Sequence, residues 1–371
     1  MQPFIITGTY RTGTTLIEKL LDVHSGLHVL SQPLPLLYRH LKEVFYRRKG
    51  ITNKYYVLND LFHPEYEPGE LKTFLENYLI GRDELRQVLR TMEGWDGQYT
   101  RFNDLDTFVG SYEVSGLCQF YPQLLEHFVA RGQVTAAGTK EILVEEFIPY
   151  LLDCGIKVIL VIRDPRDVYT SVNEGKGTKF TGKRRPTLFH LRNWRKSITL
   201  ANTYRDHPLC YVLKYEDLLD NKEKALKGIT DFLNVTPFPR GHFEKGIQTR
   251  TGRYWKGNSS TSLHSGINST NKDKYKKYLS PETIGYIEFI CHPEMRVFGY
   301  DEQMQNFKPE TFKEPYDIVN CWLNKNMSTD KDELHAEYRR LQLLQGTEAN
   351  DPEIISTFYS LKNYHTLRSA L

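Results

Sequence analysis

The chain has 371 residues, of which 39% are hydrophobic and 26% are charged, and its formal net charge is +3. This composition is typical of a globular protein, and the small positive excess excludes the strongly basic surface of a nucleic-acid-binding protein. No apolar run approaches the ~18 residues that a membrane span requires, and the first strand begins too early to leave room for a signal peptide. We therefore expect a cytoplasmic protein without nucleic-acid or membrane partners, and the composition leaves a homo-oligomer open.

The first predicted element is a strand, Phe4–Thr7, which runs into a glycine-bounded turn and then into an amphipathic helix. Gly8 and Gly13 let the backbone turn its N–H groups toward an anion, and the helix start adds its positive dipole end. The spacing Gly-x4-Gly-Thr-Thr follows the phosphate loop of nucleotide triphosphatases without its lysine. Because the nearest cation is Arg11, the loop favours a nucleotide with a single 5′-phosphate and a transferable group beyond it, although an ordinary strand-turn-helix would have the same pattern. The candidate cradle residues are Arg11, Thr12, Gly13, Thr14 and Thr15.

Residues 34–135 are largely helical by their pattern, and Leu71–Leu89 is the clearest helix. We interpret this stretch as a helical cap inserted into the domain, where it could form the pocket for an acceptor molecule. It carries no motif that identifies the acceptor.

A second buried strand, Lys157–Ile162, ends in Arg163, turns at Asp164-Pro165 and opens a helix that carries Ser171. Arg163 offers a planar fork of donors and Ser171 offers a hydroxyl, so both can bind one phosphate. Two other interpretations stay open at this point. Asp164 would be a magnesium ligand if this were a Walker B strand, or Arg163 would form a surface ion pair with a neighbouring carboxylate.

A third strand, Cys210–Leu213, completes a pattern in which strands alternate with helices. This alternation predicts an α/β fold of three layers, α/β/α, with a central parallel sheet whose ligands bind beyond the carboxyl ends of the strands. From residue 301 onward the pattern changes to charged helices, such as Asp330–Leu344 and Pro352–Leu361. We expect one domain over residues 1–300 and a helical C-terminal extension over residues 301–371 that serves packing or dimerisation.

The cysteines are odd in number, irregularly spaced and without a Cys-x-x-Cys pair. We therefore expect reduced, mostly buried thiols, as in a cytosolic protein. The five are Cys118, Cys154, Cys210, Cys291 and Cys321.

The two phosphate-binding motifs together resemble those of the sulfotransferases that use 3′-phosphoadenosine 5′-phosphosulfate (PAPS). In that family a 5′-phosphosulfate loop, here Arg11–Thr15, precedes a 3′-phosphate motif, here Arg163 with Ser171 eight residues later. The segment Tyr211–Leu218 is similar to the family's strand-Tyr-Glu-Asp-Leu element, which implies that Tyr215 lies near the adenosine.

A late segment, Gly252–Ser260, loosely resembles the basic loop that closes over the nucleotide in this family. The resemblance implies nucleotide-binding roles for Arg253, Lys256, Asn258 and Ser259.

The resemblance implies a P-loop-like sulfotransferase fold and transfer of a sulfuryl group from PAPS to a hydroxyl or amine. The acceptor would be a small molecule, the product adenosine 3′,5′-bisphosphate, and no metal would be required. Arg11 stands where many relatives have lysine. Since arginine stays protonated at neutral pH, its help to the leaving group would be electrostatic.

The general base has several candidates. Glu141 stands where small-molecule members of the family carry their catalytic histidine, within a similar stretch. Tyrosylprotein members use a glutamate shortly after the first helix, and this chain has Ser31 and Gln32 there, so the tyrosylprotein mechanism is in doubt. His24 and His28 are further candidates.

Two functions of other classes stay open beside this one. A nucleotide kinase or triphosphatase could use the same fold, although the missing lysine argues against it. A non-catalytic protein could have kept the nucleotide cradle and lost its base.

Overall fold

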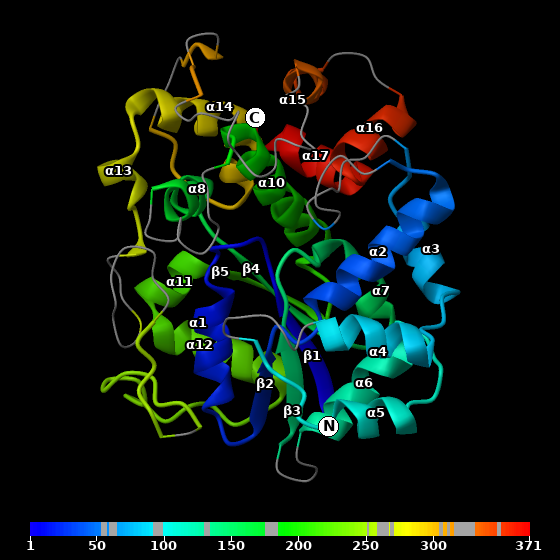
Figure 1. Ribbon diagram of the computed structural model, residues 1–371. Helices are drawn as coiled ribbons and strands as arrows, with labels where there is room; N and C mark the ends of the chain where they lie inside the picture. Colours follow the sequence, from blue (N-terminus) through cyan, green and yellow to red (C-terminus); the bar gives the residue numbers. More distant parts are fainter. Residues whose placement is uncertain are drawn as a thin grey trace.

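A parallel β-sheet lies at the centre of the molecule (Figure 1). The computed structural model describes residues 1–52, 58, 65–91, 99–129, 134–174, 185–250, 252–257, 267, 271–303, 307–309, 312–314, 331–346 and 350–371. Within these residues the sheet has five strands in the order β2-β3-β1-β4-β5. They are β1 (Gln2–Thr7), β2 (Leu27–Ser31), β3 (Ala136–Lys140), β4 (Lys157–Ile162) and β5 (Cys210–Lys214). The strand that precedes the cradle, β1, therefore lies in the middle.

Helices cover both faces of the sheet, which confirms the predicted three-layer α/β/α fold. Side chains alternate along β1, so Phe4 and Ile6 pack on one face and Ile5 on the other. The first face is covered by α1 (Thr14–Asp22), α11 (Tyr215–Asp220) and α12 (Lys222–Leu233). The second is covered by α2 (Pro35–Lys49), α6 (Leu117–Phe128), α7 (Ile148–Asp153, after the 3-10 turn Glu145–Phe147) and α10 (Thr187–Tyr204).

The sequence pattern predicts β1, β4 and β5 but not β2 and β3. The reason is clearest for β3, whose sequence Ala-Ala-Gly-Thr-Lys has little β propensity apart from threonine. All five residues are nevertheless buried, because β3 pairs with β1 on one side and β2 on the other. Gly138 is required in this strand, since a Cβ there would lie 2.2 Å from the carbonyl oxygen of Phe4.

The described part of residues 34–135 is mainly helical. Besides α2 and α6 it contains α3 (Glu70–Glu76), α4 (Arg82–Thr91) and α5 (Leu105–Ser111). The expectation of one helix over Leu71–Leu89 is wrong, because residues 77–81 separate α3 from α4. The backbone there leaves the helical pattern when Ile80 donates its N–H to the carbonyl of Ser115, in an isolated antiparallel bridge.

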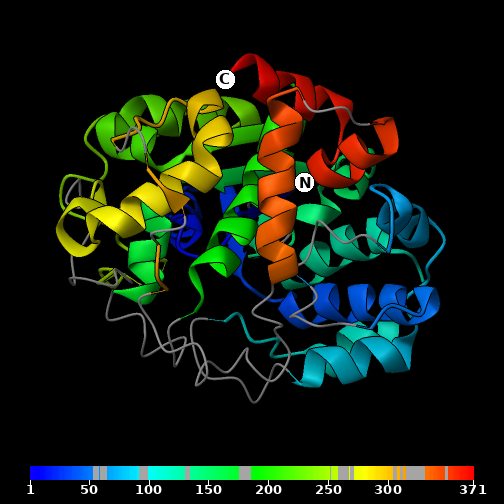
Figure 2. The same cartoon turned by 90° about the horizontal axis from the view of Figure 1, so that it is seen from above.

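The C-terminal helices pack beside α10 and α14 (Pro281–Val297) (Figure 2), and Figure 1 shows them at one end of the molecule. They are α15 (Lys331–Leu344), α16 (Asp351–Phe358) and α17 (Leu361–Ser369). Buried ion pairs make this contact specific: Arg340 lies 2.8 Å from Glu294 on α14, and Glu337 pairs with Arg195 on α10. Because an unpaired buried charge is costly, these pairs fix α15 on the domain. The division of the chain at residue 300 stays a prediction.

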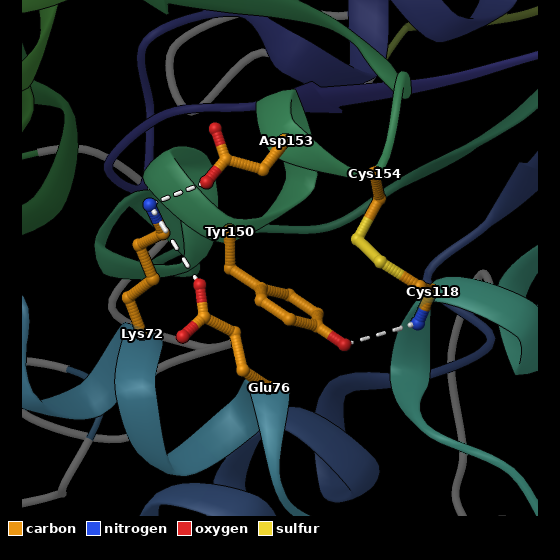
Figure 3. The surroundings of a disulfide bond; sticks show 6 residues. All are labelled: Lys72, Glu76, Cys118, Tyr150, Asp153 and Cys154. Carbon is orange, nitrogen blue, oxygen red and sulfur yellow. Dashed lines mark hydrogen bonds and ion pairs between the residues drawn. A yellow bond between two sulfur atoms is a disulfide. The ribbon is translucent and has the colours of Figure 1, made fainter.

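A disulfide joins the start of α6 to the end of α7 (Figure 3). It links Cys118 to Cys154, whose Cα atoms lie 5.3 Å apart. The expectation of reduced thiols is therefore wrong for this pair, because the fold brings together two helix ends that are 36 residues apart in sequence. Beside the bond, the Tyr150 hydroxyl accepts the N–H of Cys118 (Figure 3). The thiols of Cys210 and Cys291 are buried and free, while Cys321 lies outside the described residues.

Candidate active site

The loop between β1 and α1 has the backbone that the sequence predicts for an anion cradle. Gly13 caps α1 with a φ of 103°, and a Cβ in its place would lie 2.3 Å from Cδ2 of Tyr215. Arg11 also has a left-handed backbone, with a φ of 65°, which few residues other than glycine adopt. Thr14 and Thr15 form the first turn of α1. The helix N-terminus therefore opens at the carboxyl end of the central strand, where a phosphate would meet its N–H groups.

Hydrogen bonds on both sides of Arg11 fix this loop. The Thr12 hydroxyl donates to the carbonyl of Thr9 at 2.7 Å, and the N–H of Thr9 donates to the Ser197 hydroxyl on α10 at 3.0 Å. The Tyr10 hydroxyl lies 2.8 Å from Nδ1 of His190, also on α10. The loop is thus anchored to a helix of the other layer, and the backbone strain at Arg11 is held by its neighbours.

The second motif lies against the first. α8 (Pro165–Asn173) follows β4 and begins at the proline, as predicted. Arg163, at the end of β4, donates from Nη1 to the carbonyl of Arg11 at 3.1 Å and to the Ser171 hydroxyl at 3.4 Å. Its guanidinium lies over the ring of Tyr215, 4.6 Å from the ring centroid. The structure therefore brings together Arg11, Arg163, Ser171 and Tyr215, which lie up to 204 residues apart in sequence.

A further cation joins this group and was not among the residues that the sequence singled out. Lys274 precedes α13 (Tyr275–Tyr278), and its side chain is 8% exposed. Burial and the nearby charges of Arg163 and Arg11 lower the pKa of Lys274 to about 7. Burial, with Arg163 acting in the same direction, lowers the pKa of Arg11 to about 10. Such depressed values mean that three cations share a small, poorly solvated space, which an anion would stabilise.

The sequence offers little to distinguish Lys274 from its neighbours. The stretch Lys272–Lys277 contains four lysines, and the other three are partly or fully exposed. An alternation of lysine with a buried aromatic residue, Tyr275, is the only local signal.

Only part of the late loop that the resemblance suggested belongs to the described residues. Arg253 and Lys256 are exposed, in a hairpin bridged between Gln248 and Tyr254, while Asn258 and Ser259 lie outside the described residues. The adjacent Arg250 binds the Asp22 carboxylate and the carbonyl of Leu27, at the amino end of β2. No hydrogen bond or ion pair joins Arg253 or Lys256 to the cradle among the described residues, and their nucleotide-binding role stays a prediction.

Glu141 follows β3, at the carboxyl end of the strands, where the cradle also lies. Its side chain is fully buried, and Oε1 accepts the N–H of Leu34 at 2.8 Å. Its Oε2 has no hydrogen-bond partner among the residues that the structure describes. Burial raises the pKa of Glu141 to about 8, although Lys140 opposes this. Among the described residues Glu141 forms no ion pair with Lys140 or Arg163, and the Lys140 ammonium donates to the Gln32 side chain at 2.6 Å.

The two histidines lie near the amino end of β2, at the opposite end of the strands from the cradle. His24 follows α1 and contacts the Thr236 carbonyl at 2.7 Å through Nε2, and its own carbonyl accepts the N–H of Leu27, where β2 begins. His28 lies on β2, 3.6 Å from Asp22. Because strands of five or six residues are roughly 15–20 Å long, neither ring reaches the cradle. The Ser31 hydroxyl donates to Glu18 at 2.9 Å, in the position where the tyrosylprotein glutamate would be expected.

Asp164 does not present a free metal ligand. Its carboxylate caps α8 through the N–H of Arg166 and pairs with the Arg166 guanidinium at 2.6 Å. Within the described ranges, no three His, Cys, Asp or Glu side chains gather in a metal-binding group.

A glycine-bounded turn thus leads from the central strand of a parallel α/β sheet into a helix N-terminus, and an arginine from the adjacent strand lies beside it. A family model described as "Sulfotransferase family" matches residues 3–240. The chain therefore belongs to the sulfotransferase family, as the motifs imply. No curated protein matches the sequence.

Solved sulfotransferase structures resemble the chain at low identity. The sulfotransferase domain from the curacin biosynthetic pathway is 20% identical, over 82% of this chain and 99% of that one, with a TM-score of 0.48. The sulfotransferase domain of the Synechococcus PCC 7002 olefin synthase is 17% identical, over 81% and 95%, with a TM-score of 0.45. Mouse sulfotransferase SULT7A1, solved in complex with PAP, is 12% identical, over 80% and 85%, with a TM-score of 0.40. In the described part of this chain, no helix has the length and apolar character needed to cross a membrane.

Proposed function

We propose that this protein transfers a sulfuryl group from PAPS to a hydroxyl or amine of a small-molecule acceptor and releases adenosine 3′,5′-bisphosphate. The observation that carries the proposal is the group of three cations at the cradle, Arg11, Arg163 and Lys274, of which Arg163 and Lys274 are buried. The residues fit an anionic nucleotide in a second respect. Nε of Arg163 is a buried donor without a partner among the described residues, which a phosphate oxygen would satisfy.

The two phosphate ends of the nucleotide have separate binding residues in this proposal. The 5′ end would lie on the N–H groups and hydroxyls of residues 12–15, beside Arg11. The 3′-phosphate would bind Arg163, Ser171 and Lys274. Arg163 donates a hydrogen bond to Ser171, and its charge lies close enough to Lys274 to lower the pKa of that lysine. Tyr215 would then hold the adenosine side, since its ring fills the space between the two motifs.

Arg11 supports the reaction by its charge. The sulfuryl sulfur exchanges its bond to the 5′-phosphate oxygen for a bond to the acceptor atom, and negative charge develops on the departing phosphate. A fixed cation and helix N–H donors at that position lower the barrier. The proton stays on the guanidinium, because even its lowered pKa of about 10 lies above neutral pH.

Glu141 is the proposed base that takes the acceptor's proton. Its unpartnered Oε2 can accept that proton, while Oε1 stays bound to the N–H of Leu34. Its raised pKa of about 8 gives it a proton affinity suited to a general base near neutral pH. We also propose that the reaction requires no metal and that the protein works in the cytoplasm.

A binding experiment tests the proposal. We expect adenosine 3′,5′-bisphosphate to raise the melting temperature of the full-length chain, and ATP with magnesium to raise it less. Transfer of label from PAPS to a panel of small hydroxyl and amine acceptors, in the presence of EDTA, tests the reaction. Greater stabilisation by ATP with magnesium would instead favour the kinase or triphosphatase function, and binding without transfer to any acceptor would favour a non-catalytic nucleotide-binding protein.

A further inference from the structure

The Asp167 carboxyl group gathers donors from two distant parts of the chain. It lies in the first turn of α8 and is 1% exposed. Its Oδ2 accepts the N–H of Asp273 at 3.0 Å and Nη2 of Arg163 at 3.2 Å, and its Oδ1 accepts the N–H of Tyr275 at 3.1 Å. One side chain thus binds the backbone on both sides of Lys274.

The backbone of the segment is shaped for this contact. Asp273 has a left-handed backbone, with a φ of 59°, at the residue whose N–H meets Asp167. A second attachment comes from Arg163, which donates from Nη2 to the carbonyl of Asn271. Arg163 and Asp167 therefore hold residues 271–275 at three backbone atoms, on both sides of Lys274.

We propose that Asp167 is a positioning residue, which holds residues 271–275 on α8 so that the Lys274 ammonium faces Arg11 and Arg163 and recognises a 3′-phosphate. This inference rests on the proposed function. It assigns to Asp167 the preference for a nucleotide with a 3′-phosphate over one without it, although Asp167 itself would not touch the nucleotide.

The charges around Lys274 support this role. Among the described residues, no carboxylate lies within ion-pair distance of its ammonium, and the charges that act on it most are those of Arg163, Asp167 and Arg11. The two arginines repel the ammonium. Without the hydrogen bonds to Asp167, the segment could therefore relieve the repulsion by moving away, and Lys274 would become solvated.

A simpler role is also available to Asp167. An acidic residue in the first turn stabilises any helix through the macrodipole, and a buried carboxyl group that pairs with Arg163 stabilises the local fold. The test must therefore measure something that lost stability alone would not change.

The variant Asp167→Asn changes one carboxyl oxygen to an amide nitrogen. In either orientation of the amide, one of the two backbone N–H groups then faces a donor. We expect the affinity of the full-length protein for adenosine 3′,5′-bisphosphate to fall about tenfold or more, and the affinity for adenosine 5′-phosphate to change little. Isothermal titration calorimetry measures both. Asp217→Asn, in the first turn of α11 and exposed, is the matched control and should leave both affinities unchanged.

A double-mutant cycle with Lys274→Met identifies the route of the effect. If Asp167 acts through Lys274, then Asp167→Asn should cause no further loss of 3′-phosphate affinity in a protein that already carries Lys274→Met. If Asp167→Asn folds poorly, Asp273→Pro gives a second way to release the segment, because proline lacks the N–H that Asp167 accepts and cannot adopt a positive φ.

Equal losses of affinity for the two nucleotides, or additive effects in the cycle, would overturn the inference and leave the proposed function intact. Failure of the unmodified protein to bind adenosine 3′,5′-bisphosphate would instead overturn the proposed function.

Discussion

The guanidinium of Arg163 lies over the ring of Tyr215, 4.6 Å from its centroid. The same ring has Gly13 beside it, so closely that there is no room for a Cβ. The tyrosine therefore lies between the cradle and the 3′-phosphate motif. A substitution that displaces its ring from one of the two should also alter nucleotide binding at the other.

A methyl group at position 13 should show this coupling. Gly13→Ala would place its Cβ 2.3 Å from Cδ2 of Tyr215, in addition to the strain of a positive φ. Gly50→Ala is the matched control, because its φ is 71° but nothing lies within 4 Å of the added atom. We expect each variant to lose roughly 1–2 kcal/mol of stability from the backbone alone, and only Gly13→Ala to lose nucleotide affinity. Thermal unfolding and nucleotide titration measure the two effects; equal nucleotide affinities in both variants would contradict the prediction.

Glu141→Gln should separate activity from stability. Glutamine keeps an oxygen for the N–H of Leu34 but cannot take a proton, so kcat should fall by about 10²–10⁴-fold if Glu141 is the base. In the unmodified protein, kcat should rise with pH up to about 8, as Glu141 ionises. Single-turnover transfer from PAPS across this pH range is the measurement. An unchanged rate in the variant would remove Glu141 from the mechanism.

The stability of the folded protein should fall as pH rises, whereas kcat should rise. Burial raises the pKa of Glu141 from its ordinary 4.5 to about 8, so the folded protein holds a proton that the unfolded chain releases. This contribution to stability is fully present below pH 4.5 and is lost as pH rises through 8. Glu141→Gln should therefore match the unmodified protein near pH 4.5 and be more stable above pH 8. Denaturant unfolding at both pH values checks the sign.

Nucleotide binding should take up protons at Lys274. Its pKa of about 7 in the unbound protein lies below its ordinary value, because of burial and of the two neighbouring arginines. A bound phosphate would restore the charged form, so affinity should decrease as pH rises above 7. Calorimetry at pH 8 in buffers with different ionisation enthalpies measures the uptake. Lys274→Met should abolish it, while Lys277→Met, an exposed neighbour, should retain it.

Reduction of the disulfide should destabilise the protein. The Cys118–Cys154 bond closes a loop across 36 residues, for which the chain-entropy model gives ~4 kcal/mol. A reductant should lower the melting temperature of the unmodified protein but not of the variant Cys118→Ala/Cys154→Ala. Equal responses of the two proteins would mean that another thiol is responsible.

The parts of the site that the sequence reveals are the local ones. The cradle depends on glycines at fixed spacing and on a helix start directly after a strand, so consecutive residues predict Arg11 through Thr15 and their conformation. The same holds for Arg163 and Ser171, which belong to one strand-turn-helix unit. Their meeting with Tyr215 follows from the parallel order of the strands, because carboxyl ends of parallel strands meet at one edge.

The parts that the sequence conceals depend on tertiary contacts. β3 forms because its neighbours bury it, in spite of its weak β propensity. Lys274 is brought to the site by hydrogen bonds to Asp167, more than a hundred residues away in sequence. His24 is distant from the cradle because it follows α1, which runs from the carboxyl end of β1 back to the amino end of β2. No spacing in the sequence predicts the pairing of Cys118 with Cys154.

The central place of β1 has a consequence for the choice of acceptor. The contacts proposed for the nucleotide lie toward β4 and β5, whereas Glu141 and the helix α2 that follows Leu34 lie toward β3 and β2. The residues proposed to hold the nucleotide and the residue proposed to act on the acceptor therefore follow different strands, on opposite sides of β1. Under the proposed function, substitutions beside β2 and β3 would change the choice of acceptor while the donor site beside β4 and β5 stayed the same.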